Sequence, residues 1–134
     1  MYEPIRTKSV HSTPVRASDV PHRTREEELD IQLAGHLSAL LAVTDELRAC
    51  GSSADLDSAA DKLARQVTRL RAGRAPMRVH ADGTGHSPTS LHRRAHALAG
   101  RALLVAASRA DTASAILAAQ RMDAHTAALS GAAH

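Results

Sequence analysis

Apolar residues recur at steps of three and four residues in three segments of this chain, and that period is typical of amphipathic α-helices. Residues at these spacings share one face of a helix, so each segment has one side to bury. The three segments span about residues 24–50, 53–72 and 88–129. We therefore expect an all-α protein, an antiparallel three-helix bundle that occupies residues 24–130.

Start and stop signals for helices stand at the ends of these segments. Thr24 is followed three residues later by Glu27, the spacing of a capping box, in which each side chain accepts a hydrogen bond from the backbone N–H of the other. Ser87 precedes Pro88, and proline suits the first position of a helix. A glycine follows each of the first two segments, at Gly51 and Gly73. Each predicted helix therefore begins or ends at a recognisable residue.

The third segment is very long and has no proline or glycine between Ser108 and Thr112, which favours one continuous helix to about Leu129. The alternative is a break near Arg109, which would give the bundle four helices. A continuous third helix would be roughly 60 Å long, against roughly 40 Å and roughly 30 Å for the first two. Its unpaired end would carry Ile116, Leu117 and Met122. An apolar patch of that kind needs a cover, so we expect a homodimer.

Residues 1–23 show no helical or strand period and hold three prolines among serines, threonines and charges of both signs. We expect this N-terminal arm to be disordered. The chain has no Phe or Trp and a single Tyr, so its core must consist mainly of aliphatic residues and alanine. Alanine lets helices approach closely but buries little area, so such a core gains from a partner subunit.

The formal net charge is +3, and nearly all of the basic residues are arginine, a bias that a GC-rich genome explains without any role for nucleic acid. Cys50 is the only cysteine, so no internal disulfide can form, which fits a reducing compartment. The N-terminus lacks the apolar stretch of a secretory signal. The longest apolar run, residues 102–107, is far too short to span a membrane. We expect a cytoplasmic protein.

Four polar residues interrupt the apolar stripes and are candidates for binding a small anion. His36 falls in the middle of the apolar face of the first helix. Arg109 takes an apolar position of the third helix, and Gln120 and Asp123 continue that interruption. A buried arginine could grip a carboxylate or phosphate with two parallel hydrogen bonds.

Structural explanations for the same residues stay open. His36 could be a core histidine bonded to a neighbouring side chain. Arg109 could reach water, or it could pair with a carboxylate and so fix the register of the helices. The carboxylates considered as its partner are Asp45, Glu46, Asp111 and Asp123.

His92 and His96 are four residues apart, a spacing at which two imidazoles can share one metal ion. A metal site needs at least a third ligand, and the residues between them include the cations Arg93 and Arg94. Nor does any Glu-x-x-His sequence of a di-iron bundle occur. They are weak candidates, and we expect neither a metal nor a cofactor.

Basic residues line the outer face of the second helix and could meet nucleic acid or an acidic protein. They are Lys62, Arg65, Arg69 and Arg71. A charged outer face is also the ordinary state of a bundle helix. The chain has no recognisable DNA-binding motif and no aromatic residue suited to stacking on bases, so nucleic acid is not the expected partner.

Two stretches, TREEELDIQLAGHLSALLAVTDELRA (24–49) and ALLVAASRADTASAILAAQRMDAH (102–125), resemble small uncharacterised helical proteins of actinobacteria, of the Streptomyces type. The resemblance implies a cytoplasmic bacterial protein with a lineage-specific regulatory or accessory role. It implies no activity, cofactor or catalytic residue.

No arrangement of residues typical of a catalytic site is recognisable in the sequence, so we expect a protein that is not an enzyme. The leading hypothesis is a helical accessory protein that acts as a homodimer and binds another protein. The first alternative is a bundle that binds a small anion or metabolite through His36 and Arg109. The second is a nucleic-acid accessory protein that uses the basic face of the second helix.

Overall fold

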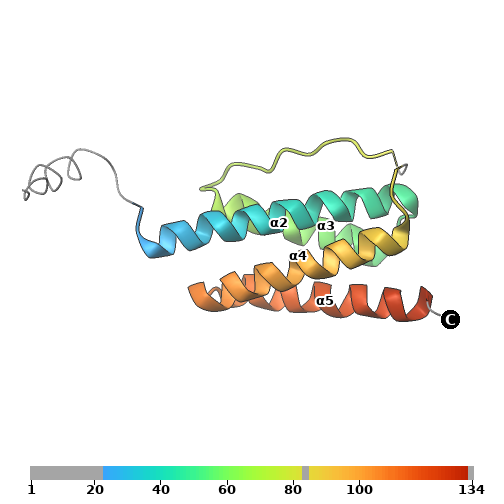
Figure 1. Ribbon diagram of the computed structural model, residues 1–134. Coiled ribbons are helices and arrows are strands. Elements are labelled where there is room, and N and C mark those ends of the chain that lie inside the picture. The colour runs from blue at the N-terminus through green and yellow to red at the C-terminus, as the bar shows by residue number, and fades with distance from the viewer. Residues whose placement is uncertain (1–22, 83–84, 133–134) are drawn as a thin grey trace, which may run out of the picture.

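The computed structural model describes residues 23–82 and 85–132, and within them it contains four α-helices (Figure 1). They are α2 (Arg25–Cys50), α3 (Ala54–Leu70), α4 (Pro88–Arg109) and α5 (Thr112–Ala132). This part of the chain contains no strand, so the predicted all-α fold is confirmed. The disorder expected of the N-terminal arm concerns residues that lie outside the described ranges, apart from Arg23.

The first three helices begin at residues that the sequence marks. Thr24 and Glu27 form the predicted capping box: the Thr24 N–H donates to Glu27 Oε1 at 2.8 Å, and the Glu27 N–H donates to Thr24 Oγ1 at 3.0 Å. Ser53 caps α3 by accepting a hydrogen bond of 3.1 Å from the backbone N–H three residues later. Ser87 caps α4 in the same way, also at 3.1 Å, with Pro88 as the first helical residue.

The predicted continuous third helix is wrong, and the alternative break near Arg109 is confirmed. After Arg109, Ala110 takes a left-handed backbone conformation (φ 58°, ψ 34°) that turns the chain back. The Asp111 N–H donates to the Ala106 carbonyl at 2.9 Å, which closes the end of α4. The Asp111 carboxylate then accepts from the Ser114 N–H at 3.2 Å and caps α5. Asp111 therefore serves both helices, without the glycine or proline that usually marks such a turn.

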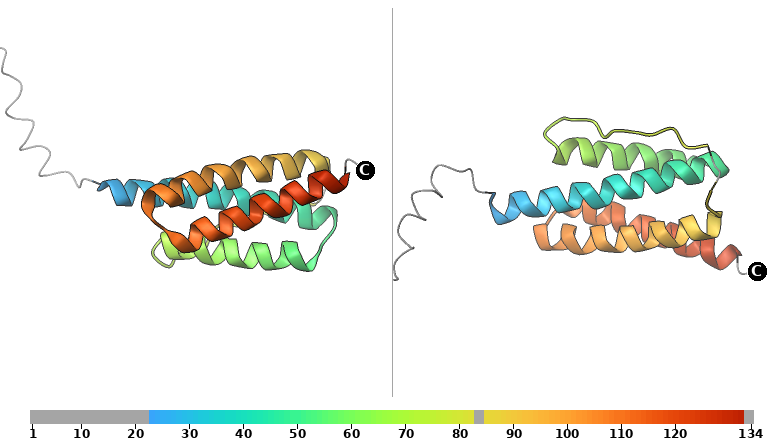
Figure 2. Two further views of the ribbon diagram at one scale, coloured as in Figure 1. Left: turned by 90° about the horizontal axis from the view of Figure 1, so that it is seen from below. Right: turned by 45° about the horizontal axis from the view of Figure 1, so that its top comes forward.

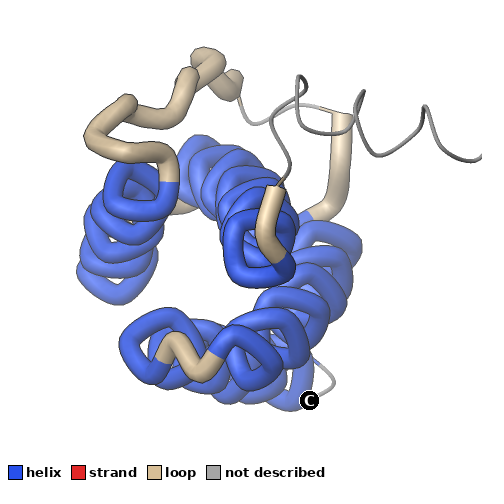
Figure 3. The backbone as a smooth tube through the Cα atoms, turned by 90° about the vertical axis from the view of Figure 1, so that its left-hand side faces the viewer, coloured by secondary structure: helices blue, strands red, loops and turns tan. Residues whose placement is uncertain are grey.

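The helices form a ring in the order α3, α2, α4, α5 (Figure 3). Neighbours around the ring are antiparallel, whereas α2 and α5 run in the same direction, as do α3 and α4 (Figure 1). α2 packs against α3 and α4, and α4 packs against α5, but α3 and α5 are the least closely packed neighbours. Figure 2 shows why: α5 begins beside the end of α3 and diverges from it towards the C-terminus. The ring is therefore most open between α3 and α5.

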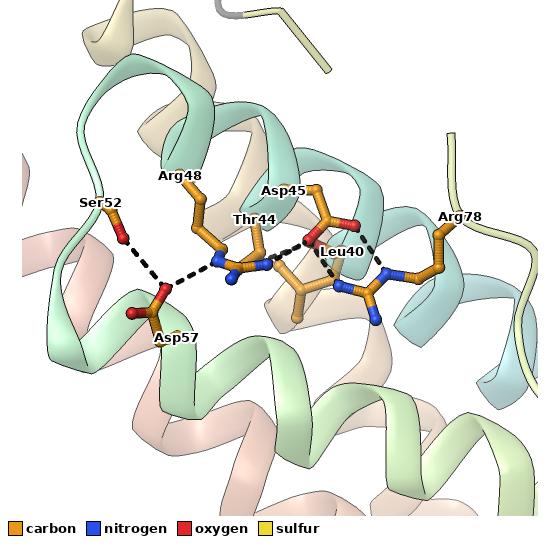
Figure 4. Close-up of polar contacts among 7 residues, drawn as sticks. All are labelled: Leu40, Thr44, Asp45, Arg48, Ser52, Asp57 and Arg78. Carbon is orange, nitrogen blue, oxygen red and sulfur yellow. Dashed lines mark hydrogen bonds and ion pairs between the residues drawn. The ribbon is translucent and has the colours of Figure 1, made fainter. Parts of the chain in front are cut away.

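After α3, residues 71–82 run along the outside of α2 towards the start of α4 (Figure 1). One long crossover of this kind is an established connection in four-helix bundles. Arg78 holds it to α2 through two bonds of 2.8 Å to the Asp45 carboxylate (Figure 4). Asp45 also accepts from Arg48 at 3.2 Å, and Arg48 donates to Asp57 on α3 at 2.8 Å. These bonds join the crossover and the start of α3 to the same turns of α2.

The core is built mainly from leucines of α2 and alanines of α4. The fully buried leucines of α2 include Leu33, Leu37 and Leu40. The alanines of α4 that have no exposed surface are Ala95, Ala99, Ala102 and Ala106. Because alanine is short, the two backbones can approach and the leucines fill the space between them at close packing. Each leucine that is fully buried contributes about 2 kcal/mol.

The chain that was predicted to overhang the bundle folds back onto it as α5. Leu117 is 6% exposed and Met122 packs against the core, whereas Ile116 stays 53% exposed. Excess helix length therefore gives no reason to expect a homodimer.

Candidate functional site

Buried polar side chains gather on α5. Of the four buried polar residues in the described ranges, three lie on this helix: Ser114, Arg121 and His125. The sequence had placed Gln120 and Asp123 on the inner face, but both are exposed. The reason is the break at Ala110, because α5 starts with a new rotation and does not continue the stripe of α4. The buried face is shifted by one to two residues from the predicted one.

Arg121 is the most unusual of these residues, because it is 4% exposed. Its Nη1 donates to both carboxylate oxygens of Asp55 on α3, each at 3.1 Å. Its Nη2 lies 3.4 Å from Nε2 of His125, one turn further along α5. Its Nε is buried and has no hydrogen-bond partner among the described residues. A buried arginine with a free donor is costly, since its charge and its N–H groups have lost their water.

The side chain that neutralises Arg121 is itself in water. The Asp55 carboxylate is 63% exposed, against 5% for the Arg121 side chain. A carboxylate in that position keeps much of its hydration, so its attraction to the guanidinium is weaker than that of a buried pair. Arg121 is therefore held by one accessible partner that another anion could displace.

His125 extends the polar chain from Arg121 to α4. It is 1% exposed, and its Nδ1 lies 2.9 Å from Nδ1 of His92, which is half-buried on α4. The ring centroids are 5.1 Å apart. Arginine only donates hydrogen bonds, so Nε2 of His125 must accept from Arg121 and carry no proton. Nδ1 of His125 then carries the proton and donates to Nδ1 of His92.

Both imidazoles are held neutral. Burial first, then the positive charge of Arg121 and the neighbouring His92 ring, lower the pKa of His125 to about 4. Burial and, less strongly, Arg121 also lower the pKa of His92. The chain Arg121–His125–His92 therefore carries one positive charge at neutral pH, located on the guanidinium.

A cavity of about 230 Å³ opens beside Arg121, in the gap between α3 and α5. Besides Arg121 and Asp55, its lining consists of Ser58, Ala59, Lys62, Leu117 and Gln120. Two cations, Arg121 and Lys62, face one carboxylate, so the cavity has a net positive charge. Lys62, Gln120 and Ser58 can all donate hydrogen bonds. The arrangement suits a small oxyanion.

The four residues that the sequence singled out as ligand-binding do not form one site. Arg109 is half-buried at the end of α4 and donates to Asp30 at 3.1 Å, a partner that the sequence analysis did not consider. His36 is half-buried on α2, and no hydrogen bond in the described ranges joins it to Arg109. Gln120 does line the cavity beside Arg121, whereas Asp123 is not among its lining residues. Only Gln120 therefore belongs to the candidate site.

The basic residues of α3 are divided among different roles. Lys62 lines the cavity described above. Arg69 donates to Asp111 at 2.7 Å and to Ser114 at 3.2 Å, so it joins α3 to the start of α5. Arg65 is exposed, and Arg71 caps the end of α3. Binding of an anionic partner to this face stays a prediction, but Arg69 already forms an ion pair with Asp111 of the same chain.

His92 and His96, the weak metal candidates of the sequence, both lie on α4 and are half-buried. His92 bonds to His125, and the nearby Arg121 charge opposes a dication. Within the described ranges, no group of three or more His, Cys, Asp or Glu side chains is placed to hold a metal ion.

Sequence reasoning missed the residues at the centre of the site: Asp55, Arg121 and His125. A signal was present, because Arg121 and His125 are four residues apart and so share one face of a helix. It could be used only after α5 was recognised as a separate helix with its own rotation.

Comparison with known proteins finds no matching protein family, no similar curated protein and no similar solved structure. Among the described helices, none combines the length and the apolar character that crossing a bilayer requires.

Proposed function

We propose that this protein is a non-enzymatic binding protein that captures a small oxyanion, a carboxylate or a phosphate, in the cavity between α3 and α5. The observation that carries the proposal is the state of Arg121. This residue is 4% exposed, lines the cavity and has a buried Nε without a partner. The sequence had suggested anion binding as an alternative function, with His36 and Arg109 as the binding residues. The proposed site uses different residues.

Binding would exchange one anion for another at Arg121. The incoming oxyanion takes the place of Asp55 at Nη1. The unpaired Nε offers a further donor, on the edge that it shares with Nη2. Asp55, which is mostly exposed, moves into water at little cost. Guanidinium groups bind carboxylate and phosphate through two parallel N–H···O bonds, and this geometry requires two donors on one edge.

Lys62 and Gln120 supply the rest of the recognition. Lys62 adds a second positive charge from α3, and the Gln120 amide adds a neutral donor from α5. A cavity of about 230 Å³ accommodates an inorganic anion or a small organic acid. The buried apolar floor of Ala59 and Leu117 favours a ligand with a short carbon chain attached to its charged group.

Thermal denaturation with sulfate, phosphate, acetate and succinate tests the proposal. We expect at least one anion to raise the melting temperature in a saturable manner, because a ligand that binds only the folded state stabilises it. Arg121→Met should abolish the effect, since a thioether cannot bind an anion.

Arg109→Met is the matched control, because Arg109 also joins two helices through one aspartate but does not line this cavity. It should leave the anion effect unchanged. A stabilisation that survives Arg121→Met, or that is lost only in Arg109→Met, would contradict the proposed site.

A second candidate function is self-association, one part of the leading hypothesis from the sequence, which was a homodimer that binds another protein. It is favoured by the α4–α5 hairpin. A hollow of about 400 Å³ lies there. Most of its lining is alanine, at positions 106, 107, 110, 115 and 119, and the partly exposed Ile116 lies beside them. Leu104, one turn before Ala107, is 73% exposed. In a two-fold dimer, Leu104 of each protomer could enter the hollow of its partner.

Light scattering after size exclusion tests self-association. Leu104→Glu should convert a dimer to a monomer, whereas Met77→Glu, on the crossover and 91% exposed, should not. A monodisperse wild-type monomer at high concentration would exclude this candidate and leave the anion site untouched.

A further inference from the structure

We propose that anion binding at Arg121 is coupled to proton uptake by the His125–His92 pair, so that acid strengthens the binding. This inference rests on the anion site proposed above. It makes the two histidines part of the site although neither of them lines the cavity.

The hydrogen-bond chain explains why the pair resists protonation in the absence of an anion. A proton added to Nε2 of His125 would point at the N–H of Arg121, 3.4 Å away. A proton added to Nδ1 of His92 would point at the N–H of His125, 2.9 Å away. Either step places two donors against each other and adds a second positive charge beside a buried guanidinium.

The charges that act on His125 come from all three helices around it. α5 contributes Arg121, α4 contributes His92 and His96, and α3 contributes Asp55. Of these, only Asp55 favours the protonated ring, and it is directed to Arg121 from an exposed position. An oxyanion that takes the place of Asp55 at Arg121 keeps negative charge on the same side, and sulfate carries one negative charge more than the carboxylate that it displaces.

Linkage fixes the direction of the effect. In the absence of an anion the pKa of His125 is about 4, so the ring is neutral at pH values well above that. Bound sulfate raises this pKa, because it brings one negative charge more than the Asp55 carboxylate that it displaces. Between the two pKa values the bound protein holds more protons than the free protein, so affinity rises as the pH falls.

The size of the coupling follows from the shift in pKa. Each pKa unit is worth a factor of ten in affinity once the pH lies below both values. Two opposite charges about 6 Å apart at an effective dielectric constant of about 20 shift a pKa by about two units. For a shift of that size we expect sulfate to bind about tenfold more tightly at pH 5 than at pH 8.

Calorimetric titration with sulfate from pH 8 down to pH 5 tests the coupling, because the charge of sulfate does not change in this range. We expect the affinity of the wild type to rise about tenfold. His125→Asn should bind with an affinity that no longer depends on pH. Titration of the wild type at pH 5 in two buffers of different ionisation enthalpy should show net proton uptake, a result that does not require any variant to fold.

Asp55→Asn is the matched control, because the Asp55 carboxylate competes with the anion for Arg121. This variant should bind sulfate more tightly than the wild type and keep the rise at low pH. If Asp55→Asn loses the rise and His125→Asn keeps it, Asp55 is responsible and the inference is wrong. If the wild type binds equally well at every pH without proton uptake, the coupling is wrong while the anion site stands. Absence of sulfate binding at every pH would overturn both.

Discussion

One ion pair joins α3 to α5 at each end of their boundary, and the two pairs differ in which charge is buried. At one end the buried partner is a carboxylate: the Asp111 side chain is 10% exposed and pairs with Arg69, which is 50% exposed. At the other end the buried partner is Arg121, and the exposed partner is Asp55. Asp111 accepts from Arg69 and from both the N–H and the hydroxyl of Ser114. Arg121 keeps an unpaired Nε.

This difference indicates that the Arg69–Asp111 pair is structural, whereas the Arg121–Asp55 pair belongs to a candidate binding site. A carboxylate that also caps a helix has its lone pairs satisfied and leaves nothing for a ligand to add. A buried guanidinium with an exposed partner has a donor and part of its charge left to offer. The divergence of α5 from α3 (Figure 2) accompanies a cavity of about 230 Å³ beside Arg121. A cavity of about 270 Å³ also lies at the Asp111 end, but its two arginines, Arg69 and Arg109, are each paired with an aspartate that lines the same cavity.

The largest expected effect is a fall in the free energy of unfolding in mild acid, caused by His125 beside Arg121. The pKa of His125 is about 4 in the folded protein and near 6.5 when unfolded, so the unfolded chain binds more protons between these values. Stability should therefore be full above pH 6.5 and decline by up to about 3 kcal/mol towards pH 4. Urea unfolding at a series of pH values measures this, and His125→Asn should flatten the profile between pH 6.5 and 4.5.

The Asp111 end should withstand the same acid. Burial acts to raise the pKa of Asp111, but the bonds from Arg69 and Ser114 outweigh it and the net pKa is lowered from 3.8. Its stabilisation is present above pH 3.8 and is lost only below it. At pH 5, amide hydrogen exchange should be faster around Arg121 than at the turn around Asp111. Slower exchange around Arg121 would contradict the comparison.

Asp111→Ala should cost about 2 kcal/mol of stability, because it removes a helix cap worth about 1 kcal/mol and a charge-assisted bond to Arg69. Chemical denaturation of the wild type and variant measures the loss. Asp111→Asn is the control, since asparagine still caps a helix, and it should lose about half as much. Equal losses in the two variants would show that the cap contributes little.

Asp55→Asn should cost only about 1 kcal/mol without an anion, because the lost partner is mostly in water. Added sulfate should then stabilise this variant more than it stabilises the wild type, since the competing carboxylate is gone. Denaturation with and without sulfate measures both quantities. A smaller sulfate effect in Asp55→Asn than in the wild type would mean that Asp55 assists binding.

Arg121→Met should have the smallest effect on stability, less than about 1 kcal/mol in either direction. A buried charged group can often be replaced by an apolar side chain of similar volume without loss. The same variant should lose all response to sulfate. A strongly destabilised Arg121→Met protein would indicate that the Arg121–Asp55 pair is mainly structural.

Local signals in the sequence were enough to predict where α2, α3 and α4 begin, because Thr24, Ser53 and Ser87 cap their helices through neighbouring residues. The end of α4 was not predictable in this way. It depends on Ala110 in a left-handed conformation, which alanine rarely adopts, and on one aspartate that serves two helices.

The error at Ala110 carried over to the site. Extending the stripe of α4 beyond the turn placed Gln120 and Asp123 inside and left Arg121 and His125 out of consideration. The partner of Arg109 was missed for a different reason. Asp30 is 79 residues away along the chain, and its proximity follows only from the packing of α2 against α4.

The most direct test of the central claim is a sulfate titration of the ¹⁵N-labelled protein followed by amide chemical shifts. The account predicts saturable shifts confined to residues 55–62 of α3 and 117–125 of α5, with none around Arg69 and Asp111. Shifts that centre on the Arg69–Asp111 end, or no saturable shifts at all, would contradict it.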